Sequence, residues 1–226
     1  MGLNKSIGQM YPWISHTFNP IKGCSHNCSY CYLNSRGFDM TPRLAEKELK
    51  TNLGKDRIIF IGSSSDMFGD WIPHEWIIKV LDHCKKYPDN QYVFQTKDPG
   101  RYQNFCRHGY FEPTEKYLLG TTIETDEYPL EYQTFAPPIW ERWRGLYELS
   151  IRRRKFVSIE PIMDFNLNLL TDMIKTIDPE FVTIGADSKG NKLVEPSWWK
   201  VGALIGELKK FTEVKIKSNL DRLQGK

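Results

Sequence analysis

Three of the chain's five cysteines lie within eight residues, and this group has the clearest chemical potential in the sequence. Cys24, Cys28 and Cys31 have the spacing C-x3-C-x2-C. Three thiolates on one short loop can hold three corners of a cube-shaped iron–sulfur cluster, because soft thiolate ligands suit iron. No fourth cysteine is near, so the fourth iron would stay open to a small molecule. Gly23 precedes the first cysteine and lets backbone N–H groups turn toward a negatively charged cluster.

A structural zinc site is the alternative for these cysteines, with His16 or His26 as the fourth ligand. Zinc sites commonly use two separated ligand pairs, whereas this chain has a single group of cysteines. The comparison favours iron and sulfide over zinc. A disulfide within the group is not expected, because the N-terminus carries no apolar secretory signal.

The bulk composition predicts a soluble protein of the reducing cytoplasm. The chain has 226 residues, enough for a substantial core, and we expect one domain over 1–226 with its core at about 14–217. A net charge of +3 argues neither for nor against nucleic acid as a partner. No apolar run reaches the ~20 residues of a membrane span, so no contact with a membrane is expected.

Predicted strands and helices alternate along the chain. Apolar runs indicate strands at 14–18, 57–62, 92–95, 117–123, 156–159, 181–184 and 214–216. Helical spacing of apolar residues indicates helices at 43–50, 73–84, 98–108, 139–149, 167–177 and 198–208. This alternation predicts a parallel sheet with right-handed crossovers. Six such units are fewer than the eight of a closed TIM barrel, so the expected fold is α/β, a partial (β/α)6 TIM-like barrel.

Polar side chains follow the predicted strands. Ligand sites in parallel α/β folds lie at the carboxyl ends of the strands, so these residues should share one edge with the cysteine loop. They are Ser63, Ser64, Ser65, Asp66, Lys97, Glu124, Glu160, Asp187 and Ser188. Each also has an ordinary structural interpretation: Asp66 could cap a helix, and Glu160 precedes a proline.

The cysteine loop resembles the cluster motif of the radical S-adenosylmethionine (SAM) enzymes, C-x3-C-x-aromatic-C, with Tyr30 at the aromatic position. Between about Thr17 and Leu220, further short motifs resemble a phage-encoded and bacterial radical SAM family of unknown function. These motifs are Asn19-Pro20, Ser65-Asp66 with Phe68, Gln95-Thr96-Lys97, Ser158-Ile159-Glu160-Pro161, and Gly185 with Ser188. One departure is Gly185-Ala186-Asp187-Ser188, where family members often have Gly-Glu-Ser-Gly.

The resemblance implies the radical SAM type of barrel, a [4Fe-4S] cluster and SAM (S-adenosyl-L-methionine) bound to its open iron. In that family, electron transfer from the cluster cleaves SAM to a 5′-deoxyadenosyl radical, which abstracts hydrogen from a substrate. An external electron donor is then a required partner. The implied assignments are the cluster on Cys24, Cys28 and Cys31, the SAM amino group on Ser63, Ser64 and Asp66, the ribose on Glu124, adenine on Tyr30, and further cofactor contacts from Asp187 and Ser188.

Lys97 and Glu160 are the candidate catalytic residues, because both end strands on the expected cavity face. A lysine there can bind the SAM carboxylate or an anionic substrate group such as a phosphate. An unpaired buried charge is costly, so we expect Glu160 to pair with Lys97 when no substrate is bound.

The substrate class stays open between a small molecule and a nucleotide or nucleic acid, the latter suggested only by the phage-type resemblance. The alternative function is a nucleic-acid-associated binding module with a structural metal loop. The basic run Arg152–Lys155 precedes a strand, so it should lie at the opposite end of the barrel as a solvated patch. Cys84 and Cys106 are expected in the core.

Overall fold

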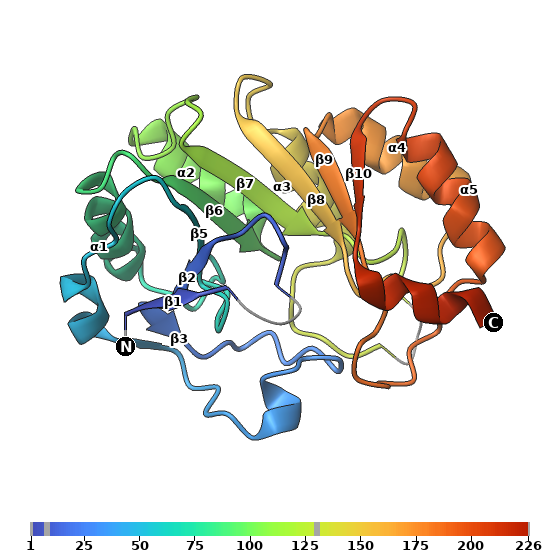
Figure 1. Ribbon diagram of the computed structural model, residues 1–226, viewed down its shortest axis with the longest axis horizontal. Coiled ribbons are helices and arrows are strands. Elements are labelled where there is room, and N and C mark those ends of the chain that lie inside the picture. Colours follow the sequence, from blue (N-terminus) through green and yellow to red (C-terminus); the bar gives the residue numbers. More distant parts are fainter. Residues whose placement is uncertain (1, 7–9, 129–131, 226) are drawn as a thin grey trace.

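The structure is a computed structural model that describes residues 2–6, 10–128 and 132–225. Within these residues, eight strands form one sheet in the order β1-β2-β5-β6-β7-β8-β9-β10 (Figure 1). Their bounds are Leu3–Lys5 (β1), His16–Phe18 (β2), Ile58–Ile61 (β5), Gln91–Thr96 (β6), Tyr117–Thr122 (β7), Arg154–Ile159 (β8), Phe181–Ile184 (β9) and Glu213–Ile216 (β10). Neighbouring strands are parallel except β1, which runs antiparallel to β2. The predicted α/β fold is confirmed.

Five α-helices connect the strands in the described part of the chain and pack on one face of the sheet (Figure 1). They are His74–Lys85 (α1), Tyr102–Arg107 (α2), Ile139–Tyr147 (α3), Leu167–Ile177 (α4) and Trp198–Leu208 (α5). Most of the apolar side chains that predicted the helices by their spacing are buried against the sheet; in α4 these are Leu170, Ile174 and Ile177, whereas Leu167 is partly buried. Cys84 of α1 lies in this core with no exposed surface, as predicted, and Cys106 of α2 packs against it half-buried.

The other face of the sheet forms the inside of the partial barrel, and side chains from residues 10–14 pack against it. Because side chains alternate along a strand, Phe60, Phe156 and Phe181 face inward, while their neighbours face the helices. Tyr11 and Trp13 stack on each other and pack against these rings. The N-terminal part of the chain thus supplies an edge strand, β1, and aromatic side chains of an inner core.

The predicted helix at 43–50 is wrong in its first half. Arg43–Leu44 form strand β4, which pairs with Ile21–Lys22 (β3), and only Glu46–Lys50 turn as a short 3-10 helix. The pairing has a clear local cause, since Leu44 lies opposite the fully buried Ile21 and gains a place against the core. The ribbon of β3 and β4 closes the base of the cysteine loop.

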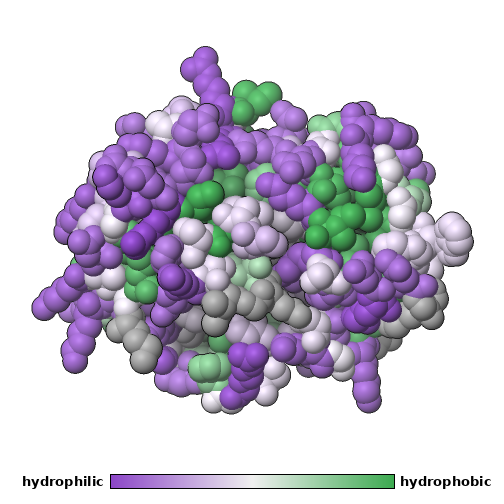
Figure 2. Space-filling model, viewed as in Figure 1, coloured by the Kyte–Doolittle hydropathy of each residue, from purple (hydrophilic) through white to green (hydrophobic). Residues whose placement is uncertain are grey.

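The basic run at the start of β8 is less solvated than predicted. Arg154 pairs with Glu180, and the Lys155 side chain is buried. The run does lie at the opposite end of the strands from the cysteine loop. Figure 2 shows a mostly hydrophilic surface around the sheet, with an apolar area over the part where β8 to β10 lie. None of the helices in the described residues is both long enough and apolar enough to cross a membrane.

Candidate functional site

The cysteine loop leaves β3 through Gly23, which the backbone geometry requires. Its φ is +81°, in the left-handed region, and a Cβ atom there would lie 2.3 Å from the carbonyl oxygen of Thr41. The next residue, Cys24, donates its backbone N–H to the carbonyl of Met40 at 2.9 Å. Gly23 also forms a parallel bridge with Ser65, directly after β5. The first cysteine is therefore fixed at the carboxyl end of the sheet.

The segment that follows β7 holds the middle of the cysteine loop. The backbone N–H of Ser29 donates to Gln133, and that of Phe135 donates to His26. The Cys28 Sγ atom lies 3.3 Å from the Thr134 hydroxyl. All five cysteines in the structure are free thiols. Two segments more than a hundred residues apart thus form one wall, a contact that the sequence did not predict.

Asp66 connects the cysteine loop to the ends of β5 and β6. His26 Nε2 lies 2.8 Å from Oδ2 of Asp66, and both side chains are buried. The same carboxylate accepts from the Thr96 hydroxyl at 2.6 Å, from the Lys97 backbone N–H at 2.7 Å and from Phe68 at 3.1 Å. Burial by itself raises the pKa of Asp66, but the hydrogen bonds from His26, Thr96 and Lys97 outweigh it, so the pKa is lowered. Asp66 is therefore an ionised anchor.

Glu124 is a second anchor, fully buried after β7. One carboxylate oxygen accepts from the Tyr30 hydroxyl and from Lys97 Nζ; the other accepts from Arg142 Nη1 at 2.9 Å and from Tyr128 at 3.2 Å. Burial raises the pKa of Glu124, yet the charges of Lys97 and Arg142 outweigh it and lower the pKa to about 2. Tyr30 lies between two cysteines, so this contact fixes the far part of the cysteine loop.

The structure brings together Tyr30, Lys97 and Glu124, which the sequence assigned to different parts of the site. Lys97 Nζ lies 2.5 Å from the Tyr30 hydroxyl and pairs with Glu124. Arg142 was missed, because it sits within a helix and the sequence gives no sign that it turns into the barrel. As direct contacts to SAM, Asp66 and Glu124 stay predictions; in the structure each carboxylate already has four donors.

The predicted pairing of Lys97 with Glu160 is wrong. Lys97 follows β6 and reaches Glu124 after the adjacent β7, whereas Glu160 follows β8, one strand further on. Glu160 instead pairs with Lys217, whose Nζ lies 2.6 Å from Oε1. Lys217 comes directly after β10, the last strand of the sheet. The prediction treated all strand ends as equally close and overlooked Lys217.

Asn19, from the Asn19-Pro20 motif, organises the serines after β5. Its side-chain oxygen accepts from the Ser63 hydroxyl at 3.0 Å and from the Ser64 backbone N–H at 3.2 Å. Tyr32 donates to the Ser63 carbonyl at 2.6 Å. The Ser64 hydroxyl is buried and has no hydrogen-bond partner among the described residues. Ser64 is thus a candidate donor or acceptor for a ligand.

Asp187 and Ser188 follow β9 and behave differently from each other. The Asp187 carboxylate closes its own loop by accepting from the backbone N–H groups of Lys189 and Asn191 and from the Asn191 side chain. Ser188 is exposed. Their predicted cofactor contacts stay predictions.

A zinc ion in the cysteine loop would need a fourth ligand beside the three cysteines. Across residues 2–6, 10–128 and 132–225, no three His, Cys, Asp or Glu side chains converge closely enough for a single metal ion. His26 Nε2 is engaged by Asp66, and His16 lies on β2 beside Ser15. The Nδ1 atom of His26 is buried without a hydrogen-bond partner among the described residues, so a zinc site with His26 as the fourth ligand stays a prediction.

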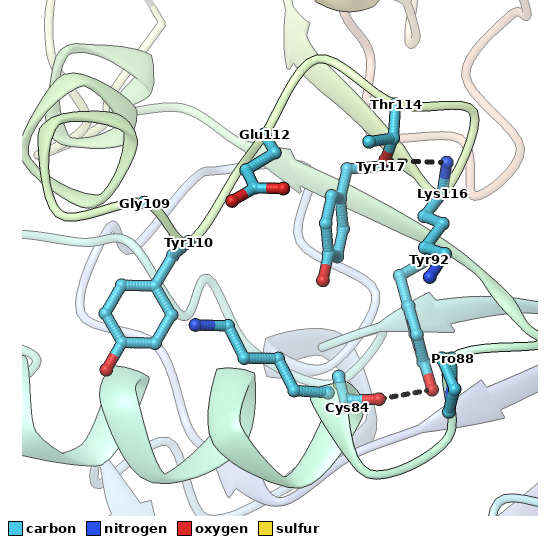
Figure 3. Close-up of a pocket in the computed structure, with 10 residues that line it drawn as sticks. Cys84, Pro88, Tyr92, Gly109, Tyr110, Glu112, Thr114, Lys116 and Tyr117 are labelled. Atoms are coloured by element: carbon cyan, nitrogen blue, oxygen red, sulfur yellow. Dashed lines mark hydrogen bonds between the residues drawn. The ribbon is translucent and has the colours of Figure 1, made fainter.

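A separate hollow of ≈ 240 Å³ lies at the other end of the strands (Figure 3). It is lined by Tyr92 and Tyr117 near the starts of β6 and β7, and by Lys85, whose Nζ lies 3.9 Å from the ring centre of Tyr110. None of the predicted site residues lines this hollow. Its position opposite the cysteine loop separates it from the candidate site.

Comparison with known proteins gives a family without an assigned activity and a fold with known examples. A family model described as "Protein of unknown function (DUF5131)" matches residues 9–201. A search of curated proteins finds no match. A variant of spore photoproduct lyase is similar in structure, with a TM-score of 0.66 and 12% identity over 93% of this chain and 78% of that chain.

A second variant of spore photoproduct lyase, with bound AdoMet and dinucleoside spore photoproduct, gives a TM-score of 0.59 and 12% identity over 91% of this chain and 64% of that one. At this identity the likeness shows the fold alone, a partial barrel with a mostly parallel sheet, as the sequence predicted.

Proposed function

Because this chain belongs to the DUF5131 family, whose function is unknown, we propose its activity from its site: it is a radical SAM enzyme. The observation that carries the proposal is the double anchoring of the cysteine loop. His26 binds Asp66 after β5, and Tyr30 binds Glu124 after β7. Lys97 contacts both carboxylates, through its backbone N–H and through Nζ. Such a scaffold holds three thiols at the carboxyl ends of a partial barrel, where this fold class places its ligands.

The side chains of the cysteine loop have the chemistry that an iron–sulfur cluster needs. Cys24, Cys28 and Cys31 are free thiols on one loop, and their charges would act on one another. Burial, followed by the charge of Asp66, raises the pKa of the Cys24 thiol to about 12. Iron binds the thiolate, so uptake of a cluster must release the proton of this thiol.

SAM is proposed to bind beside this loop. When bound, the cluster and SAM together would supply a 5′-deoxyadenosyl radical that abstracts hydrogen from a substrate. Among the chain's own groups, the unpartnered Ser64 hydroxyl is suited to the amino group of SAM, and Asn19 fixes the serine loop. Asp66 and Glu124 then act as positioning residues: they hold His26, Tyr30 and Lys97 in place around the cofactor. Buried, fully bonded carboxylates are suited to this task.

The substrate is proposed to be a nucleotide or nucleic acid. The support is the fold shared with spore photoproduct lyase, solved with AdoMet and a dinucleoside spore photoproduct. A reductant from outside the chain completes the reaction.

Purification under anaerobic conditions tests the cluster. We expect brown protein with about four irons and four sulfides per chain after reconstitution, the content of a [4Fe-4S] cluster. Stoichiometric zinc without sulfide would instead support a structural metal loop in a nucleic-acid-binding module.

A further inference from the structure

The inside of the barrel above the aromatic floor is lined by polar side chains. The Tyr11 hydroxyl lies 2.8 Å from Gln95 Oε1 and 2.9 Å from Ser158 Oγ. Gln95 in turn donates to Thr122 at 2.9 Å. Burial, followed by the charge of Glu160, raises the pKa of Tyr11 far above its usual value, so the hydroxyl stays protonated. The polar layer formed by Tyr11, Gln95 and Ser158 above the aromatic rings therefore carries no charge; it is called the polar floor below.

An ion pair stands above this floor, at the open side of the barrel. Glu160 and Lys217 are largely buried, with side chains 22% and 13% exposed. Lys217 Nζ lies 2.6 Å from Glu160 Oε1 and 5.2 Å from the centre of the Tyr11 ring. Gly185, at the end of β9, leaves room for the pair: a Cβ there would lie 3.1 Å from both the Glu160 carboxylate and Asn219 Oδ1.

Several atoms of this group have no partner within the described residues. The second oxygen of Glu160 accepts no hydrogen bond there, and Asn219 Oδ1 is buried without a donor. The Lys217 ammonium has three N–H groups and uses one of them on Glu160. Free acceptors and free donors thus lie side by side, and leaving the buried Asn219 Oδ1 unpaired is costly unless a ligand or water supplies the hydrogen.

We propose that Glu160 and Lys217, with Asn219 beside them, recognise the donor–acceptor edge of a nucleobase. This inference rests on the proposed function and specifies its substrate class. Glu160 accepts an N–H of the base, and Lys217 donates to the neighbouring carbonyl or ring nitrogen. The polar floor around Tyr11 lies beneath the bound base. Enzymes that act on a base commonly read its pairing edge through hydrogen bonds.

Charge and geometry together exclude the simpler ligands. A phosphate would accept hydrogen bonds from Lys217 but would be repelled by the negative charge of Glu160. A cationic group would bind Glu160 but would be repelled by the positive charge of Lys217. A neutral ligand that both donates and accepts satisfies the pair without breaking it. A peptide group is neutral too, but its trans geometry directs N–H and C=O to opposite sides. A ring amide or amidine, as in a nucleobase, has both on one edge.

Binding of small probes to the iron-loaded protein tests this, read by ligand-observed NMR. The probes are the four deoxynucleosides, N3-methylthymidine, N-methylacetamide and ribose 5-phosphate. We expect at least one deoxynucleoside to bind with a Kd of about 1 mM or tighter. N-methylacetamide and ribose 5-phosphate should not bind. If thymidine binds, N3-methylthymidine should bind about tenfold more weakly, because the methyl group removes the donor.

Two variants locate the binding. Lys217→Met keeps the apolar stem and removes the charge, and Glu160→Gln keeps the shape and replaces one acceptor. Each should weaken nucleoside binding about tenfold, whereas Lys210→Met, on an exposed lysine paired with Glu207, should not. Thermal unfolding identifies a variant that has failed to fold, and the other variant then decides.

The outcomes separate this inference from the proposed function. Iron-loaded protein that binds no deoxynucleoside, or that binds ribose 5-phosphate through Lys217, overturns the base-recognition site and leaves the radical SAM assignment standing. The base-recognition site is also overturned if Lys217→Met and Glu160→Gln both bind nucleosides as tightly as wild type. Protein that takes up no iron and sulfide contradicts the proposed function itself.

Discussion

His26 Nε2 lies 2.8 Å from Oδ2 of Asp66, and this contact joins the cysteine loop to the sheet. A carboxylate can only accept, so the hydrogen belongs to His26 Nε2. His26 also packs edge-on against Trp71, with ring centres 4.6 Å apart. The residue between the first two cysteines is therefore held on both its polar and its apolar sides. Rigid support of this kind keeps ligands close to their bound geometry before the ligand arrives.

Asp66→Asn should reduce the iron content after reconstitution and destabilise the fold by about 1–3 kcal/mol, because a buried amide cannot accept from all four donors. Iron and sulfide assays and urea unfolding measure the two effects. Asp70→Asn, an exposed carboxyl four residues away, is the matched control and should change neither. Normal iron content in Asp66→Asn would show that the anchor does not position the loop.

Glu124→Gln should destabilise the protein by about 3–5 kcal/mol at pH 7, since it leaves Arg142 and Lys97 beside an uncharged group. Urea unfolding measures the loss. Glu148→Gln removes a comparable but exposed partner of Arg144 and should cost less than about 1 kcal/mol. Equal costs for the two variants would contradict the anchoring role.

The same carboxyl gives a pH dependence whose sign follows from its pKa. Folding lowers the pKa of Glu124 from 4.5 to about 2, so its contribution is complete above about pH 4.5 and is lost as the pH falls toward 2. The free energies of unfolding of wild type and Glu124→Gln should therefore converge on acidification below about pH 4.5. A difference that stayed constant over that range would mean that Glu124 has the same pKa in the folded and unfolded chains.

Gly23→Ala should abolish cluster assembly, because the new Cβ would overlap the backbone at Thr41 as well as straining φ. Gly37→Ala is the control for strain alone: it lies on the same loop with φ +68° but has open space around it. Iron content after reconstitution distinguishes them. We expect a large loss in the first variant and about wild-type iron in the second, and equal losses would refute the packing argument.

Ser64→Ala should weaken SAM binding about tenfold and leave the iron content unchanged, because it removes one unpartnered hydroxyl and nothing that holds the loop. Ser150→Ala, near the opposite end of the strands, is the control. Calorimetric titration of the iron-loaded proteins with SAM measures the affinities. Unchanged affinity would remove Ser64 from the SAM site.

The positions of the strands along the chain were predictable because each buried strand is a short apolar run between polar residues, as at 57–62 and 92–95. The cysteine spacing likewise pointed directly to one loop. Side-chain partners were not predictable, because they depend on which strand ends are neighbours and how far each side chain reaches. Glu124, Glu160 and Asp187 all follow later strands, and only the order of the strands in the sheet selects Glu124 as the partner of Lys97. Lys217 and Arg142 carry no motif, so their inward position emerges only from the fold.

The most direct measurement is the formation of 5′-deoxyadenosine by the reconstituted protein in the absence of oxygen, with SAM and a strong reductant. The radical SAM assignment predicts its formation by wild type, its loss in Cys24→Ala, Cys28→Ala and Cys31→Ala, and its retention in Cys106→Ala, whose thiol lies half-buried on α2. Wild-type protein that carries its full iron and sulfide and yet forms no 5′-deoxyadenosine would contradict the assignment.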